Sequence, residues 1–218
     1  MSDTQHHSKN RRILIIDDNR AIHEDFRKIL AEDKADSSKV DDFEASLFGE
    51  SATDKPKEDQ TPFEIDSAFQ GQEGLGLVRQ SLQENRPYPM AFVDMRMPPG
   101  WDGVETISRI WEEYPDLQVV ICTAYSDYSW DQMVKKFGNT DRLVVLKKPF
   151  DSIEVLQLTQ TLTEKWQLSQ ETKRKISDLH QMLHERTEEL KEANAALEAE
   201  TVARKRVEEK LKAKDAGK

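Results

Sequence analysis

The sequence is short of cysteine and of long apolar runs. Its 218 residues contain one cysteine, Cys122, which excludes an internal disulfide and a zinc site built from cysteines. No apolar run approaches the roughly 18 residues that a membrane span needs. The polar start, MSDTQHHSKNRR, has no apolar signal segment. We therefore expect a cytoplasmic protein with no membrane partner.

The sequence also has fewer basic than acidic residues. The chain has 32 lysines and arginines against 42 acids, a formal net charge of −10, which disfavours a broad nucleic-acid interface. Charged residues nevertheless make up 34% of the chain, more than a typical globular domain carries. We therefore expect no nucleic-acid partner, and we expect part of the chain to lie outside a packed core.

Short apolar runs alternate with helical patterns from residue 12 to about residue 165. Continuous apolar runs of four to six residues are typical of strands buried on both faces of a parallel sheet. Between them, segments such as RAIHEDFRKIL place apolar residues at helical spacing. The alternation predicts a doubly wound α/β domain. Its five strands are expected near residues 13–16, 63–69, 90–93, 117–122 and 143–146.

Two further segments do not follow this alternation. Residues 33–61 are rich in acids, which predicts a solvated insertion in the domain, and residues 1–11 are expected to form a disordered tail. After Asp151 neither glycine nor proline occurs until Gly217, so residues 166–218 are predicted to form one long helix.

A heptad repeat runs through this predicted helix. Its a positions are good coiled-coil residues and its d positions are mediocre. The pattern favours a parallel dimeric coiled coil, and the alternative is a single solvated helix held by charge pairs. The a series reads Ile176, Leu183, Leu190, Leu197, Arg204 and Leu211, and the d series reads Leu179, Arg186, Ala193, Glu200 and Val207.

Polar side chains follow the strands at the edge where ligands of such sheets bind. Three carboxylates gathered there would repel one another unless a hard divalent cation such as Mg²⁺ were present. A lysine and a hydroxyl beside them make sense if a phosphoryl group also binds. The pattern indicates an aspartate that accepts a phosphoryl group as an acyl phosphate. The residues that follow the strands are Asp17, Asp18, Asp94, Thr123, Lys147 and Lys148.

Helix capping is the alternative explanation for these acids. Asp102 precedes a predicted helix and is expected to cap it. The same role for Asp17, Asp18 and Asp94 would leave Thr123 and the lysine unexplained.

Four segments carry a family resemblance. ILIIDDN, FVDMRMP…DG, ICTAYSD and LKKPF occur in this order, each at a strand end. Over residues 12–165 they resemble the receiver domain of two-component response regulators, the CheY-like superfamily. The resemblance implies a flavodoxin-like fold and Mg²⁺-dependent phosphoryl transfer from a sensor histidine kinase or phosphotransfer protein. The helix after residue 166 is similar to signalling helices that link receivers to output domains.

The resemblance also implies roles for individual residues. Asp94 is the expected phosphoacceptor, Thr123 the switch hydroxyl and Lys148 the site lysine, with a cis bond to Pro149. Arg96, Ala124, Tyr125 and Pro149 are expected neighbours of the phosphoryl group. The expected ligands of Mg²⁺ are Asp17, Asp18, Asp94 and the backbone carbonyl of Arg96.

The chain departs from the family pattern in three places. The turn MPPGWDG is one residue longer than usual, which predicts Trp101 beside the site, and the insertion at 33–61 is also unusual. Val145 stands where the family often has an aromatic residue that moves with the threonine.

Two other functions remain open. The chain could be the N-terminal receiver part of a larger hybrid histidine kinase or diguanylate cyclase, although we expect no output enzyme domain within it. A remote alternative is an aspartate-nucleophile phosphatase, which needs an acid where Arg96 stands.

Overall fold

The computed structural model of the chain describes residues 9–31, 62–124 and 130–215. The predicted insertion at 33–61, most of the predicted tail at 1–11, and Tyr125 lie outside these ranges. The predictions made for them therefore stay predictions.

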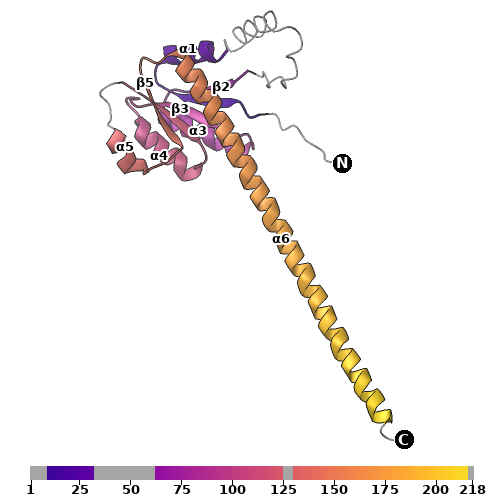
Figure 1. Ribbon diagram of the computed structural model, residues 1–218. Coiled ribbons are helices and arrows are strands. Elements are labelled where there is room, and N and C mark those ends of the chain that lie inside the picture. The colour runs from indigo at the N-terminus through magenta and orange to yellow at the C-terminus, as the bar shows by residue number, and fades with distance from the viewer. Residues whose placement is uncertain (1–8, 32–61, 125–129, 216–218) are drawn as a thin grey trace, which may run out of the picture. The chain divides into compact units, whose positions relative to one another are not determined.

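Five strands form one parallel sheet, as predicted (Figure 1). In space they follow the order β2-β1-β3-β4-β5, and each neighbouring pair is parallel. The chain therefore moves from β1 outward to β2 and then returns to the other side of β1 for β3. In such sheets ligands bind where this direction changes, at the carboxyl ends of β1 and β3. The strands are β1 (Arg12–Ile16), β2 (Glu64–Ala68), β3 (Met90–Asp94), β4 (Gln118–Thr123) and β5 (Leu143–Lys147).

Helices cover both faces of the sheet. Alternate residues of β1 serve the two faces: Ile13 and Ile15 pack with α1 and the first part of α6, and Leu14 and Ile16 pack with α3, α4 and α5. Both faces are apolar, which explains the continuous apolar runs in the strands. The predicted doubly wound fold is confirmed. The helices are α1 (Arg20–Ala31), α3 (Gly71–Gln83), α4 (Gly103–Glu113), α5 (Trp130–Phe137) and α6 (Ser152–Asp215).

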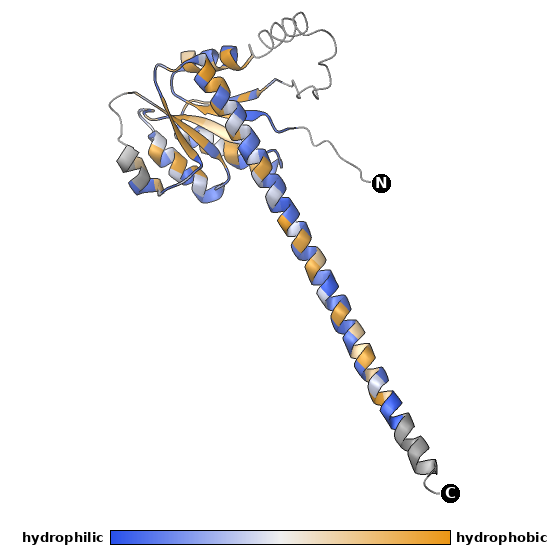
Figure 2. Cartoon of the chain, viewed as in Figure 1, coloured by the Kyte–Doolittle hydropathy of each residue, from blue (hydrophilic) through white to orange (hydrophobic). Residues whose placement is uncertain are grey.

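The chain divides into two compact units, Met1–Leu168 and Ser169–Lys218. The first unit holds the sheet and the buried α6 residues Val155, Leu162 and Trp166. The second unit consists mainly of the remainder of α6, so the predicted long C-terminal helix is confirmed. Whether it forms a separate domain with a boundary near residue 165 stays a prediction. Apolar residues lie between polar ones along the helix (Figure 2). The large apolar side chains from Ile176 to Val202 are exposed.

None of the helices in the described residues is both apolar and long enough to pass through a lipid bilayer.

Candidate functional site

The carboxyl ends of β1 and β3 bring two of the predicted acids to one lysine. The Nζ atom of Lys148, just after β5, donates to Asp17 Oδ2 at 2.8 Å and to Asp94 Oδ1 at 2.6 Å. The two carboxylates are well buried, with side chains 3% and 12% exposed, and that of Lys148 is 24% exposed. Lys147, which also follows the apolar run, is exposed. The structure therefore places Lys148 against the acids, as the sequence predicted.

Backbone amides hold the other oxygens of both carboxylates. Asn19 N donates to Asp17 Oδ1 at 2.9 Å, and Arg96 N donates to Asp94 Oδ2 at 2.8 Å. Each carboxylate thus has one oxygen fixed by its own loop and one oxygen facing the ammonium. This arrangement orients the Lys148-facing oxygens toward the same point.

Burial and charge oppose each other in this cluster. Burial raises the pKa of Asp94 above its ordinary value, and the charge of Asp17 adds to this, although Lys148 and the Arg96 amide act in the opposite direction. Burial alone would lower the pKa of Lys148, but its hydrogen bonds and charge interactions with Asp17 and Asp94 raise it overall. Lys148 is therefore held as a cation, and it only partly offsets the cost of ionising Asp94.

The remaining predicted residues lie around this cluster at different depths. Asp18 and the side chain of Arg96 are exposed. Thr123 is buried at the end of β4, and its hydroxyl donates to the Ala124 carbonyl at 3.0 Å. The peptide bond between Lys148 and Pro149 is cis, as predicted.

Two of the predicted ligands, Asp17 and Asp94, offer carboxylate oxygens that suit a divalent cation. Oxygens of Asp17 and Asp94 already converge on one positive group, and carboxylate oxygens are ligands that Mg²⁺ prefers. Within the described ranges, however, no three His, Cys, Asp or Glu side chains are grouped as a metal site. The converging pair fits the ion, and the complete ligand set with Asp18 and Arg96 stays a prediction.

The loop after Asp94 is held by a glycine that the sequence analysis did not single out. A Cβ atom at Gly103 would lie 2.5 Å from the Asp94 carbonyl oxygen, a distance too short for a side chain. The Gly103 amide donates to the Met95 carbonyl at 2.9 Å. Glycine therefore lets the start of α4 approach the backbone of the proposed phosphoacceptor.

Two other predictions concern this loop. Asp102 caps α4 as predicted, because its carboxylate accepts a hydrogen bond from Glu105 N at 2.7 Å. Trp101 packs against the core on the side of α3 and α4, with the Arg109 guanidinium 4.3 Å from its ring centroid.

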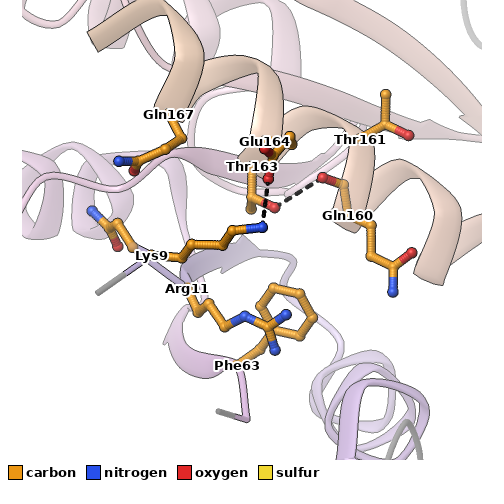
Figure 3. Close-up of a pocket in the computed structure, with 9 residues that line it drawn as sticks. Lys9, Arg11, Phe63, Gln160, Thr161, Thr163, Glu164 and Gln167 are labelled. Atoms are coloured by element: carbon orange, nitrogen blue, oxygen red, sulfur yellow. Dashed lines mark hydrogen bonds and ion pairs between the residues drawn. The ribbon is translucent and has the colours of Figure 1, made fainter. Parts of the chain in front are cut away.

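A separate cavity of about 340 Å³ lies where β1 and β2 begin, at the opposite edge of the sheet (Figure 3). Lys9 points across it to Glu164, with 3.0 Å between Nζ and Oε2. The Arg11 guanidinium lies over the Phe63 ring, 4.7 Å from its centroid. The two cations that line the cavity already have partners within the chain, so we assign no ligand to it.

Comparisons with known proteins give one family. The family model described as response regulator receiver domain matches residues 40–160, more than half of the chain. No curated protein matches the sequence at a significant level.

Solved structures share the fold at low sequence identity. An adenylate cyclase from Rhodopirellula baltica is 19% identical over 77% of this chain and 98% of its own, with a TM-score of 0.54. The signal receiver domain of an HD domain-containing protein from Pseudomonas fluorescens Pf-5 is 16% identical over 78% and 98%, with a TM-score of 0.53. NtrX from Brucella abortus, in complex with ATP, is 19% identical over 78% of this chain and 30% of its own, with a TM-score of 0.51. At these identities the likeness concerns the fold alone.

Proposed function

The chain belongs to the response regulator receiver domain family, and we propose that it is the phosphoacceptor of a two-component phosphorelay. In this proposal Asp94 receives a phosphoryl group from a sensor histidine kinase or a phosphotransfer protein. The observation that carries the proposal is the meeting of Asp94 and Asp17 at the Lys148 ammonium, at the carboxyl ends of β3 and β1.

The transfer is a displacement at phosphorus. A carboxylate oxygen of Asp94 forms a bond to phosphorus while the bond from phosphorus to the donor's imidazole nitrogen breaks. The electron pair of that bond stays on the imidazole. Lys148 lies 2.6 Å from Asp94 Oδ1, so its ammonium is within reach of an oxygen of the arriving group. Thr123 ends the neighbouring strand, and its hydroxyl can turn from the Ala124 carbonyl toward the same group.

A bound Mg²⁺ ion would neutralise the charge of the phosphoryl oxygens. We propose Asp17, Asp18, Asp94 and the Arg96 carbonyl as its ligands. The converging oxygens of Asp17 and Asp94 support this assignment.

We propose that the phosphorylation signal is transmitted through α6, and that the chain forms a homodimer in which α6 pairs with α6 of a second copy. Exposed apolar residues repeat every seven positions along the helix, at Ile176, Leu183, Leu190 and Leu197, and a second copy offers the same stripe. The heptads equally suit the alternative of a receiver part within a larger hybrid histidine kinase or diguanylate cyclase. The phosphatase alternative gains no support, because Arg96 stands where its second acid is required.

Phosphorylation with a small donor tests the proposed site. Incubation with acetyl phosphate and Mg²⁺ should add one phosphoryl group to the chain, and Asp94→Asn should abolish this addition. Asp102→Asn, at the nearby cap of α4, is the control and should be labelled as fully as the wild type. Intact-mass spectrometry measures the label. An Asp94→Asn protein that accepts the same amount of label would overturn the assignment of the site.

A further inference from the structure

A buried histidine contacts the backbone of the acid at the end of β1. His23, on α1, is almost fully buried, and its Nε2 lies 2.7 Å from the Asp17 carbonyl oxygen. Its Nδ1 lies 2.9 Å from Ser67 Oγ on β2. Since a carbonyl oxygen can only accept, Nε2 carries the proton and donates to it. In the neutral imidazole, Nδ1 is then the bare nitrogen and can accept from the Ser67 hydroxyl.

A third residue supports this arrangement of protons. Arg27, one turn further along α1, donates from its guanidinium to Ser67 Oγ at 2.7 Å. The serine oxygen thereby accepts from Arg27, and its own hydrogen remains available to donate to Nδ1 of His23. With the imidazole neutral, each group donates to the next one in a series of hydrogen bonds that begins at Arg27. The series passes through Ser67 and His23 and ends at the Asp17 carbonyl.

The carbonyl at the end of this chain belongs to the peptide that joins Asp17 to Asp18. The Asp17 amide is held independently, because it donates to the Ala68 carbonyl at 3.1 Å. The carbonyl that His23 holds lies in the same plane as the Asp18 amide. The orientation of this plane therefore sets the position from which the Asp18 side chain begins.

We propose that His23 is a positioning residue for the divalent-cation site, through its hydrogen bond to the peptide between Asp17 and Asp18. The inference rests on the proposed function, in which these two acids bind Mg²⁺. Groups that orient metal ligands without touching the ion commonly change metal affinity by about 10- to 100-fold. His23 has this place relative to Asp17, and Ser67 holds the imidazole in the tautomer that can donate.

Simple packing is the competing explanation for a buried histidine. The His23 ring also contacts Phe69, with 4.7 Å between ring centroids. If packing were its whole role, phenylalanine would serve at position 23, because it keeps a ring against Phe69. Glutamine loses the ring but places an amide donor near the position of Nε2. The two substitutions therefore separate packing from hydrogen bonding.

The experiment compares His23→Phe and His23→Gln with the wild type in the full chain. Calorimetric titration measures Mg²⁺ affinity, and the ¹⁵N–¹H spectrum without metal measures the Asp18 amide. We expect His23→Phe to bind Mg²⁺ about 10-fold or more weakly and to shift the Asp18 amide. His23→Gln should recover most of the affinity and the original shift. Equal affinity and an unchanged amide in a folded His23→Phe would overturn the inference.

Ser67→Ala provides a second variant if His23→Phe does not fold. Without the serine hydroxyl the imidazole proton can move to Nδ1, so Mg²⁺ affinity should fall several-fold, with a shift of the Asp18 amide. Wild-type values for both would again overturn the role of His23. A folded wild-type chain that binds no Mg²⁺ would overturn the proposed function together with this inference. Wild-type binding that Asp94→Asn weakens, with no effect at His23 or Ser67, would overturn the inference alone.

Discussion

Every polar group of Asp17 makes a hydrogen bond within the chain: its amide, its carbonyl and both carboxylate oxygens. A substitution at Asp17 would therefore disturb the turn between β1 and α1 as well as any bound ion. A substitution at Asp94 is therefore the better test of phosphoryl transfer. The partners of Asp17 are Ala68, His23, Asn19 and Lys148.

Replacing Lys148 with methionine tests the charge balance of the site. Asp17 and Asp94 would then face each other without a cation, and the pKa of Asp94, already raised by burial, would rise further. Folded Asp94 would keep its proton to a higher pH than unfolded Asp94, so stability falls as pH rises through that folded pKa. We expect Lys148→Met to lose about 1–3 kcal/mol of unfolding free energy in alkaline buffer, and less in mildly acidic buffer.

Urea denaturation at the two pH values measures this loss. The matched control is Lys147→Met, one residue earlier, where the side chain is exposed and little change is expected. A Lys148→Met loss that is the same at both pH values would contradict the argument from Asp94.

The sequence was sufficient to predict the charged centre of the site but not its supports. Asp17 and Lys148 follow strands of a parallel sheet and Asp94 ends one, and the carboxyl ends of such strands meet at one edge. His23 showed no comparable signal, because its partner Ser67 is 44 positions away and the pairing depends on how β2 lies beside β1. Gly103 was missed because its contact with the Asp94 carbonyl exists only in the folded chain.

At the scale of elements, β1, β3, β4 and β5 were predicted from short apolar runs, because both faces of the sheet are covered there. β2 (EIDSA) lies at the edge of the sheet, is largely half-buried, and was predicted from its alternating pattern instead. The ladders extend slightly past the apolar runs: Asp94 still pairs with Cys122, and Thr123 pairs with Lys147. These polar residues therefore belong to the rigid sheet rather than to loops.

Helix α3 gave a weaker signal than the strands. It contains several glycines, which disfavour a helix in isolation. In the fold, Gly71 lies so close to Thr106 on α4 that any side chain there would collide with it. The tertiary contact therefore explains a residue that lowers the local helical propensity.

The start of α4 allows a prediction about a single helix. Asp102 accepts from the Glu105 amide at 2.7 Å, so Asp102→Ala leaves that amide without its side-chain partner. We expect a loss of about 1 kcal/mol in unfolding free energy, measured by urea denaturation. Asp102→Asn keeps an acceptor oxygen and should lose much less. If both variants lose the same amount, the charge of Asp102 at the helix end, and not its hydrogen bond, is the stabilising feature.

At the scale of the whole molecule, the two units bury apolar surface in different ways. The first unit has a closed core on both faces of its sheet. In the second, Ile176, Leu183, Leu190 and Leu197 are between 50% and 63% exposed within one copy of the chain. Covering a leucine contributes about 1.5–3 kcal/mol, so the stripe favours association with a second helix.

Charged residues at a and d positions of the heptads limit the affinity of this dimer. A parallel dimer would place Arg186 opposite its own copy, and likewise Glu200 and Arg204. Each charge has a partner on its own helix, since Arg186 pairs with Glu189 at 2.6 Å and Arg204 with Glu200 at 3.7 Å. These pairs reduce the repulsion between copies without removing it, so a dimer of moderate affinity is expected.

The double substitution Leu183→Asn and Leu190→Asn tests this dimer. It removes two a-position leucines, and we expect a wild-type dimer to become a monomer in sedimentation equilibrium over a range of concentrations. The control, Gln181→Asn with Glu188→Asn, places asparagines at the same spacing on a different side of the helix. Because it changes helical propensity in a similar way but leaves the leucines intact, it should stay dimeric. A wild-type chain that sediments as a monomer throughout would show that α6 does not pair, and an intact dimer in the leucine variant would place the contact elsewhere.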